Sequence, residues 1–243
     1  FRENPNTFMW GQDMANKDKE GIFNVSKGMQ KEFGSERVFN APIAEDFILG
    51  TANGFSSFRE EIRVVVEGAE FADYFWPAME QLVECSHEYW RTKGQFTPNI
   101  LIRLASGGYI GGGLYHSQNI EGTLTTFPGL RIVAPSFADD VYGLVKTAMK
   151  SKGLTVLLEP KALYNSKQAM EFVPEGFEVP FGKAKVRREG SDLTLITYGN
   201  TVHHCLEAAE KLSTEGYDVE VLDLRSLRPL DENAILTSLA KTS

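Results

Sequence analysis

The chain has 243 residues, of which 42% are hydrophobic and 24% are charged, and its formal net charge is −8. Such a chain can bury a substantial core as one large or two modest globular domains. Acidic and basic residues are intermixed without a basic stripe, and no apolar run approaches the ~20 residues that span a bilayer, which argues against nucleic acid and membrane as partners.

Strand-like and helix-like segments alternate along the chain, which indicates an α/β fold with a parallel sheet. Strands are predicted at residues 7–10, 37–40, 62–66, 99–104, 130–134 and 154–159. Helices are predicted at residues 24–33, from 43 to about 55, and at 70–91, where apolar residues recur at helical spacing. A further helix is predicted up to Lys150, opened by Ser136 with Asp139 three residues later, which is the pattern of a capping box.

The texture changes at residues 171–190, where prolines and glycines interrupt any periodic run and predict a linker or a short β-hairpin. The alternation then resumes, with strands predicted at 192–198 and 218–222 and helices at 201–215 and 231–241. We therefore predict a complete α/β domain over residues 1–170, a linker at 171–190, and the N-terminal part of a second α/β domain over 191–243.

The two cysteines, Cys85 and Cys205, match neither a disulfide framework nor a metal motif. Cys85 falls on an apolar helical stripe and is expected in the core. We expect no metal site within the chain and a reducing compartment, either a bacterial cytoplasm or the mitochondrial matrix. The chain opens at Phe1 rather than at Met and stops just after a helical pattern, so we interpret it as a fragment of a longer polypeptide.

Glu45 is the most informative candidate residue. It is predicted on the first turn of a helix, close to the carboxyl end of the strand at 37–40. Ligands bind at that edge of open α/β sheets. A first-turn acid either complements the helix dipole or acts as a buried general acid/base toward a cofactor, and the local sequence leaves both interpretations open.

Three further candidates lie at the same predicted edge. The glycine-rich segment 106–113 matches neither the dinucleotide fingerprint nor the phosphate-binding loop, so we interpret it as a mobile wall of a site. His116 follows it directly and is either polar surface or an acid/base group. Tyr74 is predicted on the first turn of the long helix, where its ring either joins the core or offers a flat face to a planar ligand. No role is assigned to the remaining histidines, His87, His203 and His204.

Short motifs recur together along the chain: Gly11-Gln12-Asp13, Pro42-Ile43-Ala44-Glu45, Phe71-Ala72-Asp73-Tyr74, Leu114-Tyr115-His116-Ser117-Gln118, Pro128-Gly129-Leu130, Glu159-Pro160-Lys161 with Leu163-Tyr164, Gly182-Lys183-Ala184, Val202-His203, and Asp223-Leu224-Arg225 with Pro229-Leu230-Asp231. In this order and spacing the chain resembles the beta subunit of the decarboxylating component of 2-oxo-acid dehydrogenase complexes. These enzymes depend on thiamine diphosphate and belong to the transketolase-like superfamily. The resemblance covers essentially the whole chain.

The resemblance implies a pyrimidine-binding domain followed by the start of the family's C-terminal domain, and it implies roles for four residues. Glu45 would contact the aminopyrimidine ring nitrogen of the cofactor and share a proton with it. The ring of Tyr74 would pack on the pyrimidine, and Glu70 would stand at a less uniform position of the pocket wall. His116 would lie near the thiazolium and assist acyl transfer to a lipoyl group.

The resemblance also implies partners. Relatives hold the diphosphate and its Mg²⁺ by a Gly-Asp-Gly…Asn motif on an alpha-type domain, and no Gly-Asp-Gly occurs in this sequence. We therefore expect activity only with an alpha-type domain, on another chain or fused, and a second copy of the pair. Relatives also carry structural potassium sites. Gln12 replaces a Glu found in many members, which questions a carboxylate-based proton link between the two active sites.

The function implied is oxidative decarboxylation of a 2-oxo acid and transfer of the acyl group to a lipoyl acyltransferase partner. Segments 71–74, 114–118 and 159–161 look more like members that act on branched-chain substrates such as 2-oxoisovalerate than like pyruvate-type members. Transketolase or deoxyxylulose-phosphate synthase, which act on sugar phosphates, is one alternative. A non-catalytic α/β assembly subunit is another, and a dinucleotide-binding oxidoreductase ranks last because its fingerprint is missing.

Overall fold

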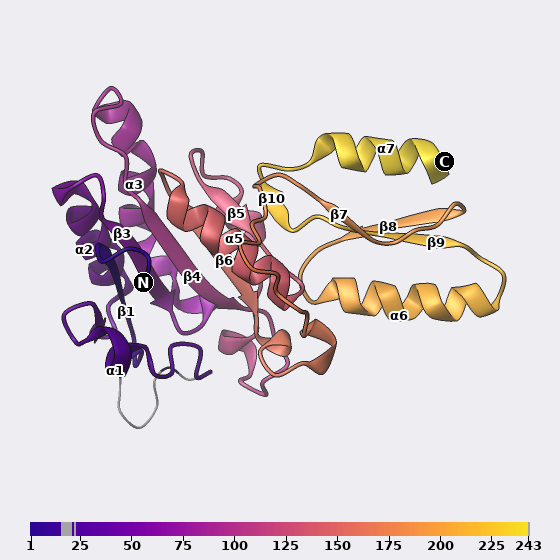
Figure 1. The fold of residues 1–243 in the computed structure, drawn as a ribbon, viewed down its shortest axis with the longest axis horizontal. Coiled ribbons are helices and arrows are strands. Elements are labelled where there is room, and N and C mark those ends of the chain that lie inside the picture. Colours follow the sequence, from indigo (N-terminus) through magenta and orange to yellow (C-terminus); the bar gives the residue numbers. More distant parts are fainter. Residues whose placement is uncertain (16–20, 22, 243) are drawn as a thin grey trace. The chain divides into compact units, whose positions relative to one another are not determined.

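A computed structural model describes residues 1–15, 21 and 23–242 as a mixed α/β structure (Figure 1). The larger sheet has the strand order β10-β5-β6-β4-β3-β1-β2, and the smaller sheet has the order β7-β9-β8. The chain divides into two compact units. The first comprises Phe1–Leu130 with Ala148–Leu157, and the second comprises Arg131–Thr147 with the chain from Leu158 onward. The predicted α/β class with a mostly parallel sheet is confirmed.

Four parallel strands form the centre of the first unit. They are β2 (Val38–Asn40), β1 (Thr7–Gly11), β3 (Arg63–Ala69) and β4 (Ile100–Ser106), paired in that order. The register places Met9 opposite Val38 and Val65, and Val65 opposite Leu101. Strand β4 is buried along its whole length, which is typical of a parallel strand covered on both faces.

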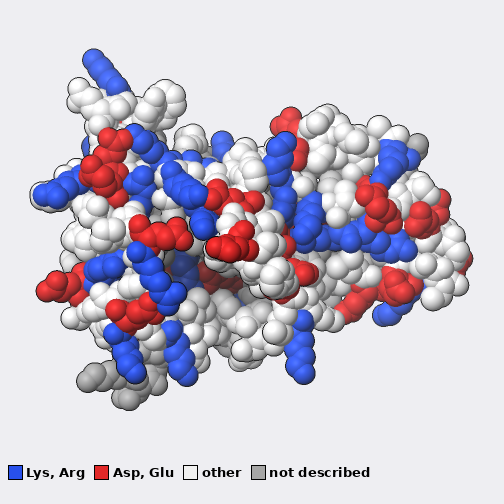
Figure 2. Space-filling view, in the orientation of Figure 1, with Lys and Arg blue, Asp and Glu red and all other residues white. Residues whose placement is uncertain are grey.

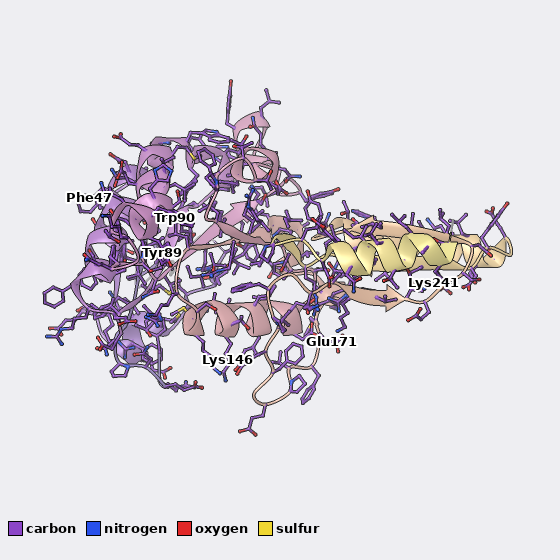
Figure 3. The ribbon with its side chains drawn as sticks, turned by 90° about the horizontal axis from the view of Figure 1, so that it is seen from above. Phe47, Tyr89, Trp90, Lys146, Glu171 and Lys241 are labelled. Atoms are coloured by element: carbon purple, nitrogen blue, oxygen red, sulfur yellow. The ribbon has the colours of Figure 1, made fainter. Side chains whose placement is uncertain are left out.

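Helices α2 (Glu45–Phe58) and α3 (Met79–Arg91) supply apolar side chains to the core of this unit, while α1 (Met29–Phe33) and α4 (Glu121–Leu124) are short. Ile48, Leu49 and Leu82 are fully buried. The apolar spacing of the helix predicted from residue 43 suggests that Ile43 and Phe47 face the core. The structure shows otherwise, because Ile43 is 83% exposed and Phe47 is 55% exposed. Figure 3 labels Phe47, together with the exposed Tyr89 and Trp90 of α3.

Two predicted helices are shorter in the structure. The helix predicted at residues 24–33 begins only at Met29, because Asn24 and Gly28 have φ of 58° and 84°, left-handed values that no right-handed helix accommodates. The helix predicted at 70–91 is divided into two 3₁₀ turns, Ala72–Tyr74 and Trp76–Ala78, before α3 begins. Pro77 lies in the second turn, and its missing N–H interrupts the helical hydrogen bonds. Tyr74 therefore lies in a separate turn after β3 and not on α3.

The second unit contains β5 (Arg131–Val133), β10 (Ser226–Arg228) and the small sheet of β7 (Lys185–Arg188), β9 (Val219–Asp223) and β8 (Leu193–Thr197). Helices α6 (Thr201–Thr214) and α7 (Glu232–Thr242) follow β8 and β10 in the chain. Val202 and Ala209 of α6 pack with Val219 and Val221 of β9 in one buried cluster. Helix α5 (Ala138–Lys150) and strand β6 (Thr155–Pro160) contribute residues to both units.

The C-terminal part departs from the expectations in two respects. Residues 171–184 contain neither helix nor strand, and β7 pairs antiparallel with β9. Of the two alternatives predicted for residues 171–190, a linker or a short β-hairpin, the local hairpin is therefore wrong. Strand β10 was not predicted, because it has three residues and no periodic pattern, and it pairs antiparallel with β5.

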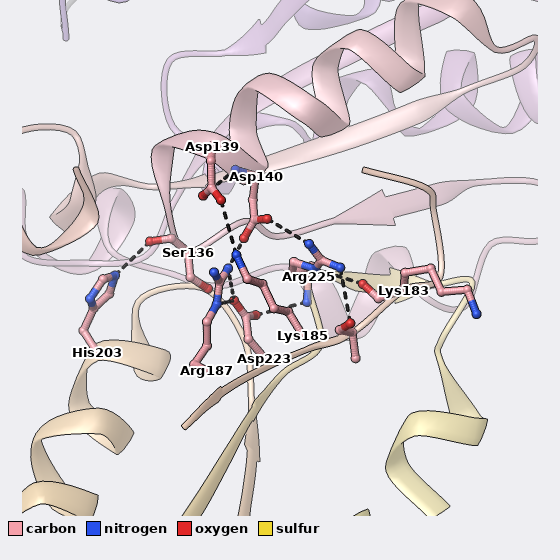
Figure 4. Close-up of polar contacts among 10 residues, drawn as sticks. Ser136, Asp139, Asp140, Lys183, Lys185, Arg187, His203, Asp223 and Arg225 are labelled. Atoms are coloured by element: carbon pink, nitrogen blue, oxygen red, sulfur yellow. Dashed lines mark hydrogen bonds and ion pairs between the residues drawn. The ribbon is translucent and has the colours of Figure 1, made fainter. Parts of the chain in front are cut away.

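A buried network of charges organises the second unit (Figure 4). Asp140, at the start of α5, is fully buried and forms an ion pair with Arg187 of β7. Its Oδ1 also lies 2.9 Å from Nη1 of Arg225. Arg187 also lies 2.9 Å from Oδ2 of Asp223 at the end of β9. Arg225 donates further bonds to the backbone oxygens of Lys183 (2.9 Å) and Ala184 (3.2 Å). The network therefore fastens the first turn of α5 to the small sheet.

The predicted capping box at the start of α5 is not formed. The buried hydroxyl of Ser136 has no hydrogen-bond partner among the described residues, and Oδ1 of Asp139 accepts the N–H of Asp140 instead. The backbone oxygen of Ser136 accepts a 2.8 Å hydrogen bond from Nε2 of His203, a buried residue of α6 (Figure 4). His203 is thus a structural residue of the second unit.

On the face shown in Figure 2, acidic and basic side chains are interspersed, as the intermixed charges of the sequence predict. Within residues 1–15, 21 and 23–242, no helix is long and apolar enough to cross a membrane.

Cys85 should be chemically inert in the folded chain. Burial raises the pKa of its thiol to about 12, so the thiolate fraction at pH 8 is on the order of 10⁻⁴. Cys205 is half-buried, and burial raises its thiol pKa as well. With iodoacetamide at pH 8, we expect mass spectrometry to detect labelling at Cys205 first and at Cys85 only after unfolding in urea. Equal labelling rates in the native chain would contradict the buried position of Cys85.

Candidate active site

The candidate residues gather after four neighbouring strands of the first unit. Gln12 follows β1 directly, and Glu45 opens α2 after β2. The turn Ala72–Tyr74 comes after β3, and the turn Leu114–His116 is reached from β4 through the glycine-rich segment. Because these strands are parallel and adjacent, their carboxyl ends share one edge of the sheet, the edge at which open α/β sheets bind ligands (Figure 1).

Glu45 lies on the first turn of α2, as predicted, and its side chain is only 6% exposed. The amide Nε2 of Gln12 donates a 2.8 Å hydrogen bond to its Oε1. A buried carboxylate is costly unless hydrogen-bond donors compensate it, and here the Gln12 amide is such a donor. Glu45 is therefore more than a solvent-exposed complement to the helix dipole. It is a buried acid at the carboxyl edge of the parallel strands.

The rings of Tyr74 and His116 lie close together although the two residues are 42 positions apart in the sequence (116 − 74). Their ring centroids lie 5.3 Å apart at an angle of 52°. The imidazole also packs edge-on against Phe71, at 4.4 Å and 80°. Such tilted and edge-on arrangements are favoured by aromatic pairs. Tyr74 remains 46% exposed, so its ring is not part of the core and can offer a face to a ligand.

The glycine-rich segment approaches His116 closely. A Cβ on Gly112 would lie 2.6 Å from Cβ of His116, so any side chain there would displace the histidine. Gly113, directly before the turn of His116, has φ of 73° and ψ of −164°, a conformation essentially restricted to glycine. These glycines serve close backbone approach, and the interpretation of the segment as a mobile wall of a site stays a prediction.

Two residues at this edge, Gln12 and Asp73, make contacts that the sequence does not predict. Gln12 was noted for its departure from the family pattern, and the structure shows it bound to Glu45. Asp73 is 8% exposed, and its Oδ2 accepts the backbone N–H groups of Ser117 (3.2 Å) and Gln118 (3.0 Å). The available signal was an acid placed inside an aromatic turn, between Phe71 and Tyr74.

Glu70 follows β3 directly and is half-buried, next to the turn that carries Tyr74. This position suits the wall of a pocket, and its role stays a prediction. Within the part of the chain that the structure describes, no group of three or more His, Cys, Asp or Glu side chains could hold a metal ion.

The fold and this edge define an α/β protein whose candidate site lies at the carboxyl ends of parallel strands, where open α/β sheets bind ligands. Residues 1–167 match the family model for the pyrimidine binding domain of transketolase, and residues 182–243 match the model for the transketolase C-terminal domain. The chain therefore belongs to the transketolase family, which confirms the resemblance derived from the motifs.

Relatives within this family are similar over most of the chain. The 2-oxoisovalerate dehydrogenase subunit beta of Bacillus subtilis (strain 168) is 37% identical over 236 residues, which cover 97% of this chain and 70% of the relative. The corresponding subunit of Pseudomonas aeruginosa is 39% identical over 96% of this chain and 69% of its own. The pyruvate dehydrogenase E1 component subunit beta of Staphylococcus aureus (strain Mu50) is 36% identical over 100% of this chain and 73% of its own.

A solved structure supports the fold. It is a split-gene transketolase, described as an inactive beta4 tetramer, and it superposes with a TM-score of 0.74 over 99% of this chain and 72% of that chain. At 24% sequence identity this likeness bears on the fold alone.

Proposed function

We propose that this chain supplies the pyrimidine-binding side of a thiamine-diphosphate enzyme that decarboxylates 2-oxo acids. The observation that carries the proposal is the buried Glu45 at the ligand-binding edge, in a chain whose relatives are named as beta subunits of 2-oxo-acid dehydrogenases. We propose residues 1–170 as the pyrimidine-binding domain, residues 171–190 as a linker and residues 191–243 as the N-terminal part of the C-terminal domain.

The residues present suit an aminopyrimidine. Gln12 occupies Oε1 of Glu45 as a donor, which leaves Oε2 to share a proton with a ring nitrogen in a dry pocket, where a charge-assisted hydrogen bond is strong. The exposed ring of Tyr74 offers a flat face on which a pyrimidine can pack. When bound, thiamine diphosphate supplies the electron sink for the charge left by decarboxylation. Glu45 and His116 are then the proposed catalytic residues, and Glu70 lines the pocket.

The proposed enzyme needs a second domain. Without a Gly-Asp-Gly in this sequence, the ligands of the diphosphate and its Mg²⁺ are assigned to an alpha-type domain, on a partner chain or in a fused one. We further propose pairing with a second copy, structural potassium sites, acyl transfer to a lipoyl acyltransferase, and a location in a bacterial cytoplasm or the mitochondrial matrix.

The favoured substrate is a branched-chain 2-oxo acid such as 2-oxoisovalerate. The motifs at 71–74, 114–118 and 159–161 support it, and the two relatives named for this substrate are 37% and 39% identical. Pyruvate is the second candidate, because a relative named for it is 36% identical. The small difference in identity does not separate the two substrates. Pocket contacts, including those from the alpha-type side, decide such discrimination.

The test is turnover by the full-length gene product reconstituted with its alpha-type partner, thiamine diphosphate and Mg²⁺. Carbon dioxide release and dye reduction are measured with 2-oxoisovalerate and with pyruvate, and ketol transfer is measured between sugar phosphates. We expect carbon dioxide release from 2-oxoisovalerate at a higher kcat/KM than from pyruvate. Ketol transfer without carbon dioxide release would refute the proposal in favour of a transketolase activity.

His116→Ala is expected to separate the two half-reactions. If the imidazole donates a proton during acyl transfer, transfer to a lipoyl domain falls by ~10²-fold, the scale of general acid/base catalysis, whereas dye-coupled decarboxylation falls only a few-fold. The matched control is His87→Ala, which removes an exposed histidine of α3 and should change neither rate. Equal losses in both assays would rule out this role for His116.

A further inference from the structure

We infer that Asp73 is a positioning residue that sets the place of His116, an inference that rests on the proposed function of that histidine. Asp73 lies between Phe71 and Tyr74, the two aromatic residues that contact the imidazole. Its carboxylate binds the backbone directly after His116, at Ser117 and Gln118. The turn that follows β3 therefore contacts the imidazole of His116 through two aromatic rings. Its Asp73 carboxylate also binds the backbone N–H groups of the two residues after His116.

The chain before His116 provides little regular support. Residues 107–113 lie outside any helix or strand and lead into a single 3₁₀ turn. After His116, by contrast, several bonds close the base of the segment. Gly107 donates its N–H to the oxygen of Gln118 at 3.1 Å, and the Ser117 hydroxyl donates to the oxygen of Gly113 at 2.6 Å. The two N–H groups bound by Asp73 belong to this base, so the carboxylate holds His116 from its C-terminal side.

Charge gives these bonds their strength. A carboxylate that accepts two backbone N–H bonds makes charge-assisted hydrogen bonds, roughly twice as strong as neutral ones. The second oxygen, Oδ1, is buried and has no partner among the described residues. An unpaired buried acceptor is unfavourable, so the stabilising contacts of this carboxylate are the two backbone bonds made by Oδ2.

A purely structural anchor and a positioning residue predict different results. A structural anchor lowers both half-reactions together through loss of folded enzyme. A positioning residue that acts through His116 affects acyl transfer and leaves dye-coupled decarboxylation nearly intact, and its effect disappears when His116 is already missing. Misplacing a reacting group by ~1 Å can cost ~10²-fold in rate, so the expected difference is large.

The experiment uses the reconstituted holoenzyme with wild-type, Asp73→Ala, Asp73→Asn and Asp73→Ala/His116→Ala chains. For Asp73→Ala, we expect lipoyl transfer to fall by ~10–10²-fold and dye-coupled decarboxylation by less than ~5-fold. Asp73→Asn keeps one oxygen that can accept both N–H groups and should recover transfer to within ~5-fold of wild type. The double variant should be no slower than His116→Ala alone, because the two residues act as one unit.

The matched control is Asn99→Ala. Asn99 is buried in the same unit and likewise holds backbone of distant segments, donating to the oxygen of Glu60 (3.3 Å) and accepting the N–H of Gly153 (3.2 Å). We expect it to leave the ratio of the two half-reactions unchanged. Additive losses in the double variant, no rescue by asparagine, or equal loss of both half-reactions would overturn the inference.

A second measurement does not depend on turnover. Chymotrypsin should cut at the exposed Tyr109 and Tyr115 at least ~10-fold faster in Asp73→Ala than in wild type or Asn99→Ala, since cleavage follows local opening. Unchanged cleavage would contradict the anchoring itself. If the wild-type enzyme decarboxylates no 2-oxo acid, the proposed function is wrong. The cleavage rates still test whether Asp73 anchors the segment around His116.

Discussion

Replacing Glu45 by alanine is expected to lower the rate of 2-oxo-acid decarboxylation by at least ~10²-fold, the scale of a proton-transfer role. The carboxylate is buried at the carboxyl edge of the sheet, and the amide of Gln12 fixes one of its oxygens. Alanine removes the group proposed to share a proton with the pyrimidine nitrogen, and it leaves the Gln12 amide without its acceptor. Thiamine diphosphate affinity should fall as well.

The matched control for this prediction is Asp46→Ala. Asp46 stands beside Glu45 on the same first turn of α2, but its side chain is exposed. Both substitutions remove an acid that complements the helix dipole, an effect of a few tenths of a kcal/mol. Carbon dioxide release measured on both variants therefore separates the proposed chemistry from helix stability. If the two variants retain similar activity, Glu45 has no catalytic role and a non-catalytic assembly subunit becomes the better interpretation.

Replacing Asp140 by alanine is expected to destabilise the second unit by about 3–5 kcal/mol, the range observed when one partner of a buried ion pair is removed. Asp140 is fully buried and pairs with both Arg187 and Arg225. Its loss leaves Arg225 without a carboxylate in the network and Arg187 with Asp223 alone (Figure 4). Native-state hydrogen exchange at the amides of β7 and β9 would report the change in the free energy of opening.

The control for Asp140 is Asp218→Ala in the same unit. Asp218 lies 3.4 Å from Nη1 of Arg188, and its side chain is 54% exposed. Exposed pairs of this kind contribute at most about 1 kcal/mol, so exchange in β9 should change little. A loss of protection in Asp140→Ala no larger than in Asp218→Ala would show that the buried network does not hold α5 to the small sheet.

Much of the strand framework was predictable, because buried parallel strands are continuous β-branched runs that stand out between turn residues. The positions of β1, β3 and β4 follow the predictions within a few residues. The first-turn position of Glu45 was predictable for the same local reason. The prediction of one long helix at 70–91 is wrong. The apolar spacing continues through Pro77, but the backbone there forms a 3₁₀ turn.

The contacts within the candidate site were not predictable from local patterns. Asp73 binds backbone 44 and 45 residues away, and Gln12 binds a side chain 33 residues away. Such pairs depend on which strands become neighbours, and periodicity carries no information on that order. The prediction of a capping box at Ser136 is wrong for a related reason. Asp139 and Asp140, which follow Ser136, form long-range bonds with Lys185, Arg187 and Arg225.

The most direct test of the proposed site is the position of the cofactor in a crystal structure of the reconstituted holoenzyme with thiamine diphosphate and Mg²⁺. We predict an oxygen of Glu45 within ~2.6–3.2 Å of the aminopyrimidine ring nitrogen, the distance that proton transfer requires. The ring of Tyr74 should pack on the pyrimidine, with Gln12 still bound to the other oxygen of Glu45. A pyrimidine bound beyond hydrogen-bond reach of Glu45 would contradict the assignment.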